Sequence, residues 1–170
     1  MRFATIISLV VIGVVSRLMP HWPNFTPVLA AALFAGVHFK DKKWAFAVPL
    51  ATMIISDLFL PYHSTMFFNY GAIALVVFVG TLITKVKFTS ILGASLLGTA
   101  LFFLITNFGS WAIDPYNMYA NDFSGLMASY VAAIPFAGNS LLADLSFNAI
   151  FFGGFALAQS KIPQLQAVKA

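Results

Sequence analysis

The run KDKK, residues 40–43, separates two apolar stretches and indicates how the chain is oriented across a membrane. A second basic run, KVK at residues 85–87, follows another apolar stretch, and Lys161 and Lys169 follow the last one. Lysine and arginine collect in the short cytoplasmic loops of membrane proteins, next to the ends of the spans. The positions of these lysines therefore indicate a chain that crosses a membrane an even number of times, with its basic loops on the cytoplasmic side.

The composition is that of a membrane protein. Of the 170 residues, 61% are hydrophobic and only 8% are charged, and the mean hydropathy is +0.92. Soluble domains carry about 25% charged residues. The net charge of +4 comes mostly from lysines that mark topology, so we expect membrane lipid rather than nucleic acid as a partner. The sequence contains no cysteine, which excludes disulfides, thiolate metal sites and cysteine nucleophiles.

Six apolar segments can be drawn against the length of about 20 residues that a crossing requires. They lie at residues 3–18, 25–39, 44–60, 66–84, 88–107 and 136–159. The first two are short, so we expect their ends either to draw on the loop between them or to be shielded by other helices. With six spans, Arg2 and every lysine lie on the cytoplasmic side, together with both termini. We therefore predict an all-α, multi-pass membrane protein, with one transmembrane domain over residues 1–170.

The segment SGLMASYVAAIPFAG, residues 124–138, allows a competing count with a seventh span. It is short for a crossing, it contains a proline near its end, and a seventh span would move the C-terminal lysines to the outer side. We predict that it forms a short re-entrant or interfacial helix before the last span.

Small residues at four-residue spacing mark expected helix contacts. Ser90, Ala94 and Gly98 follow this spacing in the fifth segment, and Ala31 and Ala35 follow it in the second. Such residues let helix backbones approach closely in lipid, where no hydrophobic effect drives association. Two interpretations stay open: packing within the bundle, or a docking face for another subunit.

Polar and aromatic side chains collect on the predicted outer side. The cytoplasmic loops hold almost only lysine, whereas the outer loops hold histidine, tryptophan, tyrosine, asparagine and aspartate. A ligand pocket with apolar walls and a few polar anchors has this pattern. The side chains that we predict to bind a small molecule from the outer side are Arg17, His21, Trp22, Asn24, Asp57, His63, Asn69, Trp111 and Asp144.

Two of these aspartates lie inside predicted spans and need partners. A charged side chain costs about 2.5–3.5 kcal/mol at the bilayer centre and less toward the ends of a span. The expected partner of Asp57 is Arg17, either in an ion pair that only joins two helices or in a pair that also contacts a ligand. Asp144 is either a ligand anchor or a helix-packing group bonded to Asn148 or Asn69.

Metal binding and catalysis have less support. His21, His63 and Asp57 could together bind a transition metal. However, no H-x-x-x-H spacing fixes their geometry, and we favour histidines that stabilise the loops. The sequence contains no G-x-S-x-G, H-E-x-x-H or Gly-rich phosphate loop. We therefore expect neither an enzyme nor a cofactor, and any uphill transport has to take its energy from elsewhere.

Three strings carry a resemblance to a known family: RLMPHWPNFTPVLAAALFAG at 17–36, SDLFLPYH at 56–63 and IPFAGNSLLADLSF at 134–147. They resemble a family of small bacterial membrane proteins that is itself similar to the S components of energy-coupling-factor (ECF) vitamin transporters. S components bind a vitamin or a metal ion from outside and work with a scaffold subunit and two ATPases. The resemblance implies the same role and partners here, in the inner membrane of a bacterium. S components often carry an A-x-x-x-A motif for the scaffold on their first helix. The first segment here departs from this pattern, and Ala31 and Ala35 supply such a motif in the second.

The first outer loop contains three prolines between residues 20 and 27. Proline restricts the backbone, so these residues either hold a rigid lid over a pocket or only shape a tight connector. A rigid lid loses less entropy when a ligand binds. An alternative function is a non-catalytic assembly subunit of a larger membrane complex. In that case the small-residue faces would carry the function and the outer cavity would hold lipid or water.

Overall fold

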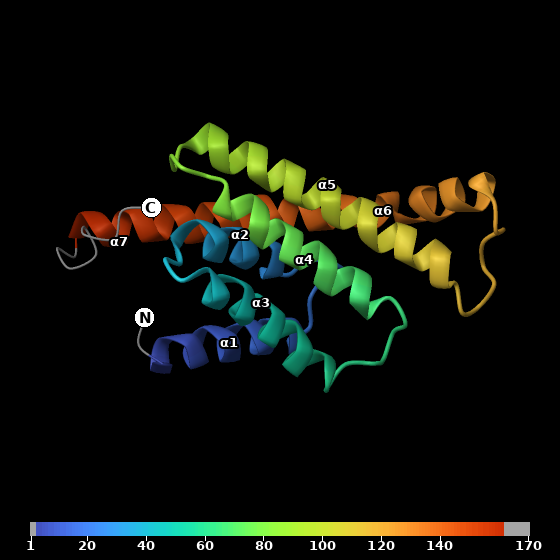
Figure 1. The fold of residues 1–170 in the computed structure, drawn as a ribbon, viewed down its shortest axis with the longest axis horizontal. Coiled ribbons are helices and arrows are strands. Elements are labelled where there is room, and N and C mark those ends of the chain that lie inside the picture. Colours follow the sequence, from blue (N-terminus) through green and yellow to red (C-terminus); the bar gives the residue numbers. More distant parts are fainter. Residues whose placement is uncertain (1–2, 162–170) are drawn as a thin grey trace.

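The computed structural model describes residues 3–161, and these residues form a bundle of helices without β-strands (Figure 1). The helices are α1 (Phe3–Leu18), α2 (Val28–His38), α3 (Lys42–Asp57), α4 (Met66–Thr81), α5 (Phe88–Ile113), α6 (Phe123–Asn148) and α7 (Gly154–Lys161). A π-helical segment, η1 (Ala149–Gly153), joins α6 to α7, so these three elements form one continuous rod. The all-α prediction is confirmed for this part of the chain.

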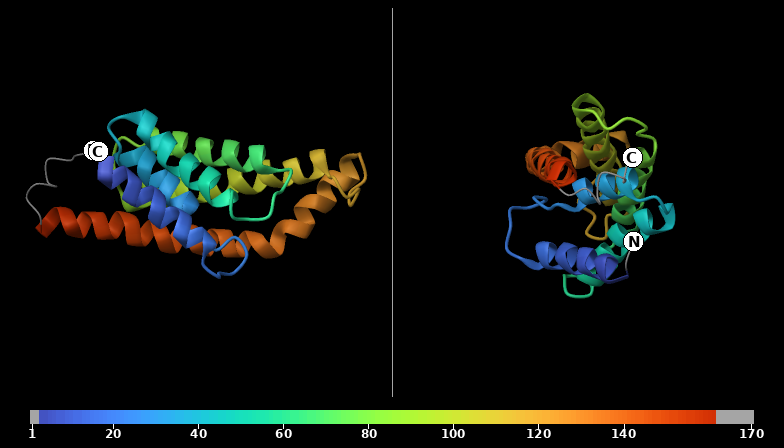
Figure 2. Two further views of the ribbon diagram at one scale, coloured as in Figure 1. Left: turned by 90° about the horizontal axis from the view of Figure 1, so that it is seen from below. Right: turned by 90° about the vertical axis from the view of Figure 1, so that its left-hand side faces the viewer.

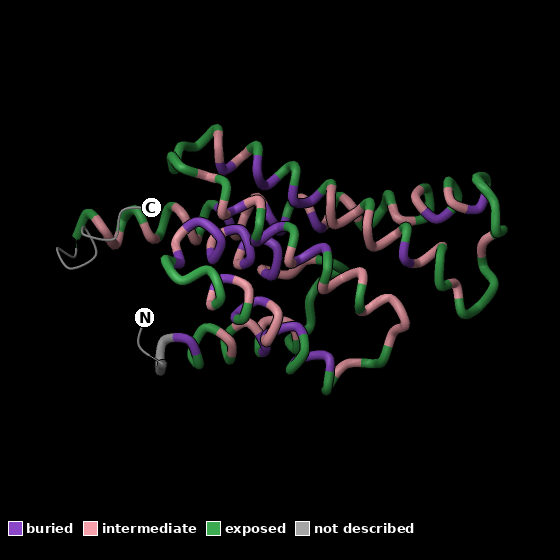
Figure 3. Tube along the Cα trace, in the orientation of Figure 1, coloured by how far each residue is buried: buried purple, intermediate pink, exposed green. Residues whose placement is uncertain are grey.

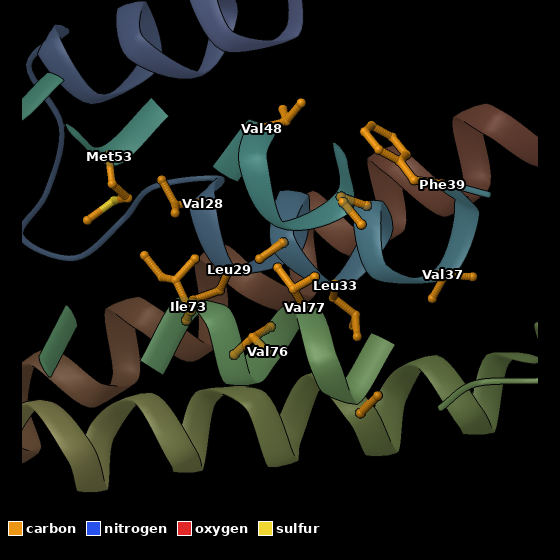
Figure 4. Close-up of a cluster of buried hydrophobic side chains, with 14 of the residues drawn as sticks. Val28, Leu29, Leu33, Val37, Phe39, Val48, Met53, Ile73, Val76 and Val77 are labelled. Carbon is orange, nitrogen blue, oxygen red and sulfur yellow. The ribbon is translucent and has the colours of Figure 1, made fainter. Parts of the chain in front are cut away.

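Helix α2 forms the centre of the bundle. Most of its side chains are buried, as expected for a helix that is apolar on every side. Its residues Leu29 and Leu33 pack against Ile73 and Val77 of α4 (Figure 4). Figure 3 shows the same concentration of buried residues along α2 and the facing sides of its neighbours.

Helices α2 and α4 touch along their backbones. A Cβ atom on Gly36 would overlap the carbonyl oxygen of Val77 and would lie 2.9 Å from the Cα of Gly80. A Cβ on Gly80 would in turn lie 2.6 Å from the carbonyl oxygen of Leu33. Only glycine fits at this crossing, which matches the close approach that small residues allow in membrane bundles.

The small residues of α5 also lie against the bundle. Ala94 and Gly98 are buried, and a Cβ on Gly98 would lie 3.3 Å from Val76 of α4. Ser90 is half-buried. The contact of Gly98 with α4 is therefore a contact within the chain, and docking of a further subunit on this face stays a prediction.

The two ends of the bundle differ in which loops they carry. The start of α1 and the end of α7 lie at the same end as the α2–α3 and α4–α5 loops, on the left in Figure 1. The α1–α2, α3–α4 and α5–α6 loops join the opposite ends of these helices, and the α5–α6 loop lies farthest from the first end. The first end has the lysine runs, and the second end has most of the polar and aromatic loop residues.

The C-terminal part of the bundle corrects one prediction. The prediction of a separate re-entrant or interfacial helix over 124–138 is wrong, because residues 123–161 form one continuous helix of 39 residues. The last helix therefore begins well before residue 136, the predicted start of the last span. Pro135 lies inside α6 and does not end it. Proline in a helix interior can produce a kink instead of a break, and Figure 2 shows α6 bending along its length. Helix α5 likewise continues past the predicted residue 107 to Ile113.

The start of α6 is fixed by Asp122. Its side chain accepts a hydrogen bond of 2.9 Å from the backbone N–H of Gly125 and another of 2.7 Å from the hydroxyl of Ser124. These bonds lower the pKa of the Asp122 carboxyl below its usual value. Aspartate is a preferred N-cap residue because it satisfies a free N–H of the first turn, so the local sequence determines where this long helix begins.

Two helical segments are long and apolar enough to cross a membrane. They are Phe88–Ile113 and Phe123–Lys161, with mean hydropathies of 2.0 and 1.6. Three further apolar helical segments are shorter, at Ile6–Leu18, Val28–His38 and Met66–Thr81. The shortest of them, α2, has 11 residues and is enclosed by other helices, in line with the expectation that neighbours shield its ends.

Candidate binding site

An ion pair joins the ends of two helices on the side of the α1–α2 and α3–α4 loops. Arg17, in the last turn of α1, donates from Nη1 to Oδ1 of Asp57 over 2.7 Å. The side chains are 13% and 4% exposed. The same nitrogen also donates to the hydroxyl of Ser56 and, over 3.3 Å, to the carbonyl oxygen of Met53. The predicted partnership of Arg17 and Asp57 is confirmed.

Tyr70 extends this pair to a third helix. Its hydroxyl, on α4, donates to Oδ2 of Asp57 over 2.7 Å. Both carboxylate oxygens are thus bonded, and α1, α3 and α4 are joined at one point. A buried carboxylate is stable when its charge is paired and its oxygens accept hydrogen bonds. Arg17 and Asp57 together therefore leave this region with no net charge.

Beside the ion pair lie two adjoining cavities, which we call together the polar cavity. Their volumes are about 210 and 180 Å³. They share walls formed by Asn24, Asn69, Phe102 and Ser140. The other walls are formed by Arg17, His21, Thr26, Val28, Leu29, Met53, Leu60, Thr65, Ile73, Thr99, Phe103, Thr106, Asn107, Ser110, Ala133, Phe136 and Ala137.

Several polar groups around this cavity have no partner within residues 3–161. The side chains of Asn24 and Asn69 make no hydrogen bond with these residues, and Arg17 uses only Nη1. Each amide has two donors and an acceptor, and the guanidinium keeps further N–H groups on Nε and Nη2. The cavity therefore offers donors and acceptors that the described protein does not use.

The α1–α2 loop is held over this cavity by contacts with α6. Asn139 of α6 donates to the carbonyl oxygen of Pro23 over 3.0 Å, and the ring of Phe25 lies 5.8 Å from that of Phe147. Asn24 has a φ of 61°, a left-handed conformation that asparagine tolerates better than most residues. The loop is therefore held both by its own backbone conformation and by α6.

His21 lines the polar cavity and is oriented by the same loop. Its Nδ1 lies 2.8 Å from the carbonyl oxygen of Met19. A carbonyl oxygen only accepts hydrogen bonds, so Nδ1 carries the proton and Nε2 of the neutral ring is left as an acceptor. His21 can therefore add an acceptor beside the donors of Arg17.

Residues 1–165 match a protein family that is described as a family of unknown function (DUF6580). The chain belongs to this family. No curated protein and no solved structure matches it. The match includes the ion pair, the polar cavity and all of the described helices, so the arrangement described above falls entirely within the matched region.

Three other predicted binding residues lie away from the walls of the polar cavity. Trp22 is 66% exposed and packs edge-on against Phe25. His63 interacts with the hydroxyl of Thr65 over 3.1 Å. Trp111 donates from Nε1 to the carbonyl oxygen of Ala120 over 2.9 Å. These three side chains organise the loops, and their contact with a ligand stays a prediction.

The metal alternative has no geometric support. Within residues 3–161, the structure forms no group of three histidine, cysteine or acidic side chains that could hold a metal ion. His21 and His63 bond to different loop atoms, and both oxygens of Asp57 are taken by Arg17 and Tyr70. The structure therefore does not bring His21, His63 and Asp57, the alternative metal set, together.

Asp144 belongs to a different cluster from Asp57. It is buried between α5 and α6 and bonds to Ser95, Thr99 and Asn148. The predicted bond to Asn148 is confirmed, and Asn69 is not among the described partners. Of this cluster, Thr99 lines the polar cavity.

Ala31 and Ala35 line a third cavity, which is apolar. It has a volume of about 410 Å³ and lies between α1, α2, α3 and the C-terminal rod. Phe34 of α2 packs its ring 5.1 Å from Phe152 and 5.6 Å from Phe155 on that rod. The two alanines therefore face the space between α1 and this rod.

Several residues of the site were not predicted from the sequence. The hydroxyl of Tyr70 reaches Asp57 across 13 residues, and Ser95 reaches Asp144 across 49. Tyrosine near the end of a span is expected at a membrane interface in any protein, and serine in a helix signals packing as readily as binding. One signal was available for Tyr70, because a buried carboxylate needs more donors than a single arginine nitrogen supplies.

Proposed function

We propose that the chain is a six-span protein of the bacterial inner membrane that binds a small polar organic molecule from the outer side, as S components do. The observation that carries the proposal is the set of unused hydrogen-bonding groups on Asn24, Asn69 and Arg17 around the polar cavity. Polar groups that converge on a cavity with partly apolar walls are the pattern of a small-molecule site.

The surface and the charges support the membrane part of the proposal. Large apolar side chains are exposed around the bundle, including Val11 and Ile12 of α1, Leu97 of α5 and Ile150 of the C-terminal rod. Exposed apolar surface on this scale is unfavourable in water and favourable in lipid. The basic loops lie together at one end, which by the positive-inside rule would be the cytoplasmic end.

The chemistry of the polar cavity favours a neutral or nearly neutral ligand. The charge of Arg17 is balanced by Asp57, and the remaining polar walls are mostly amides and hydroxyls. Phe102 and Phe103 provide aromatic surface beside them. This combination suits a vitamin-like organic molecule with several hydrogen-bonding groups better than it suits a bare metal ion.

An S-component role would also need energy from other subunits. The sequence has no nucleotide-binding loop, so an ECF scaffold and its ATPases are the proposed partners. Ala31 and Ala35 are the proposed docking residues. Because they line the apolar cavity between α1, α2, α3 and the C-terminal rod, docking there would require the scaffold to reach between α1 and that rod.

Assembly of a larger membrane complex is the second candidate function. The apolar cavity of about 410 Å³ is the feature that favours it, because another membrane protein could fill that space. The small-residue contacts of Gly36 and Gly98 favour it less, since both glycines already pack within the chain.

Native mass spectrometry of the protein purified from its own host in mild detergent tests the proposal. We expect one small molecule per chain in the wild type. Asn69→Ala removes one unused amide, and Asn24→Gly removes the other while it keeps the left-handed backbone accessible. Each loss should weaken binding roughly 10-fold, the effect of one hydrogen bond to a buried partner.

The matched control is Asn121→Ala, which removes an exposed asparagine from the α5–α6 loop outside the cavity walls. It should bind as the wild type does. Equal occupancy in Asn69→Ala and Asn24→Gly would contradict the placement of the site. A wild type that carries other integral membrane subunits and no small molecule would favour the assembly function.

A further inference from the structure

Asp144 is a buried carboxylate without a basic partner among residues 3–161. It is 2% exposed, and the ion pairs among the described residues are Arg17–Asp57 and Lys43–Asp41. An isolated charge is expensive in a medium of low dielectric constant. The structure therefore requires something other than a basic side chain to neutralise Asp144.

Three side chains donate hydrogen bonds to this carboxylate. Ser95 donates to Oδ2, Thr99 donates to the same oxygen over 3.3 Å, and Asn148 donates from Nδ2 to Oδ1 over 3.1 Å. Hydrogen bonds donated to a carboxylate stabilise its charged form. These donors favour a charge on Asp144 and burial opposes it, so an ionised Asp144 here needs a counter-charge.

Asn148 contributes an unsatisfied acceptor to the same cluster. Its Oδ1 is buried and has no hydrogen-bond partner in the described part of the chain, although the residue is only 4% exposed. Leaving a buried acceptor unpaired costs free energy, so this oxygen is expected to have a partner. Its Nδ2, on the same amide, donates to both Asp144 and Ser95, so the free oxygen lies beside this cluster.

The cluster also lies between cavities that extend toward opposite ends of the bundle. Thr99 lines the polar cavity. Ser95 and Asn148 line another cavity of about 340 Å³, whose walls include Lys87 beside the α4–α5 loop. A small ion could therefore reach the cluster through one of these cavities, without displacing tightly packed side chains.

We propose that Asp144, Ser95, Thr99 and Asn148 bind one sodium ion. The carboxylate, two hydroxyls and one amide supply oxygen ligands, which suit a hard cation. A hydroxyl can donate its proton to Asp144 and still offer a lone pair to the ion. One monovalent cation leaves the buried site neutral, whereas a divalent cation would leave a net positive charge. This site goes beyond the proposed binding function, and it would link sodium to the adjoining polar cavity.

The test measures thermal unfolding of the full chain in mild detergent, in sodium chloride and in choline chloride at equal ionic strength. Sodium should raise the unfolding temperature by roughly 3–6 °C at ten times its dissociation constant. Asp144→Asn should remove this shift. The matched control Asp122→Asn removes an exposed carboxylate and keeps a residue that caps helices well, so it should retain the shift.

Direct binding of radioactive sodium to the wild type keeps the proposal testable if Asp144→Asn fails to fold. One ion per chain is expected. Equal unfolding temperatures in sodium and choline, with no sodium bound, would overturn the proposal and assign a proton to Asp144. Because the experiment uses no organic ligand, its failure would leave the proposed function of the polar cavity standing.

Discussion

Arg17 has more donors than its structural partners use. One nitrogen, Nη1, makes the contacts with Asp57, Ser56 and Met53. The guanidinium has five N–H groups in all, and Arg17 lines the polar cavity. The two interpretations of the ion pair are therefore compatible, because the pair can join α1 to α3 while Nε and Nη2 contact a ligand.

Removal of Asp57 should destabilise the protein strongly. Asp57→Ala leaves the buried guanidinium of Arg17 without a counter-charge, and we expect a loss of about 3–5 kcal/mol in the free energy of unfolding. Unfolding in mixed detergent micelles measures this loss. Lys43→Ala is the matched control, since it breaks the exposed pair with Asp41 and should change stability by less than about 1 kcal/mol. Equal effects of the two substitutions would show that the Arg17–Asp57 pair is not a stabilising contact.

At the scale of helices, the sequence predicted the segments better than their junctions. The apolar runs located the helices, because each run is long enough to form a helix that is either buried in the bundle or in contact with lipid. The prediction of a separate helix that ends near Pro135 was wrong. Proline removes a backbone donor, but the surrounding packing determines whether the helix kinks or ends there. Ser95 and Asp144 meet across 49 residues, and no local spacing encodes such a contact.

The crossing of α2 and α4 depends on glycine. Gly36→Ala would place a methyl group against the backbone of Val77 and Gly80. We expect a loss of about 1–3 kcal/mol or more, because neither backbone can move without disturbing the central helix. Gly93→Ala is the control: no atom lies within 4 Å of its new Cβ. It should be neutral or stabilise α5 by up to about 1 kcal/mol. Similar unfolding curves for both variants would contradict the close crossing.

The whole molecule has two chemically different ends. One end carries the lysine loops, and the other carries the ion pair, the polar cavity and the loop fixed by Asn139. This asymmetry could be predicted from the sequence, because each loop follows a recognisable apolar run. The cavity could not, since its walls come from several helices that are far apart in the sequence and depend on their packing.

Labelling of single cysteines in intact cells tests most directly whether the polar cavity faces outward. The chain has no native cysteine, so Thr26→Cys, in the cavity wall, and Lys43→Cys, in the basic end, each provide one thiol. We predict that a membrane-impermeant maleimide labels Thr26→Cys in intact cells and labels Lys43→Cys only after the membrane is permeabilised. Labelling of Lys43→Cys in intact cells, with Thr26→Cys protected until permeabilisation, would contradict the proposed orientation and with it uptake from outside.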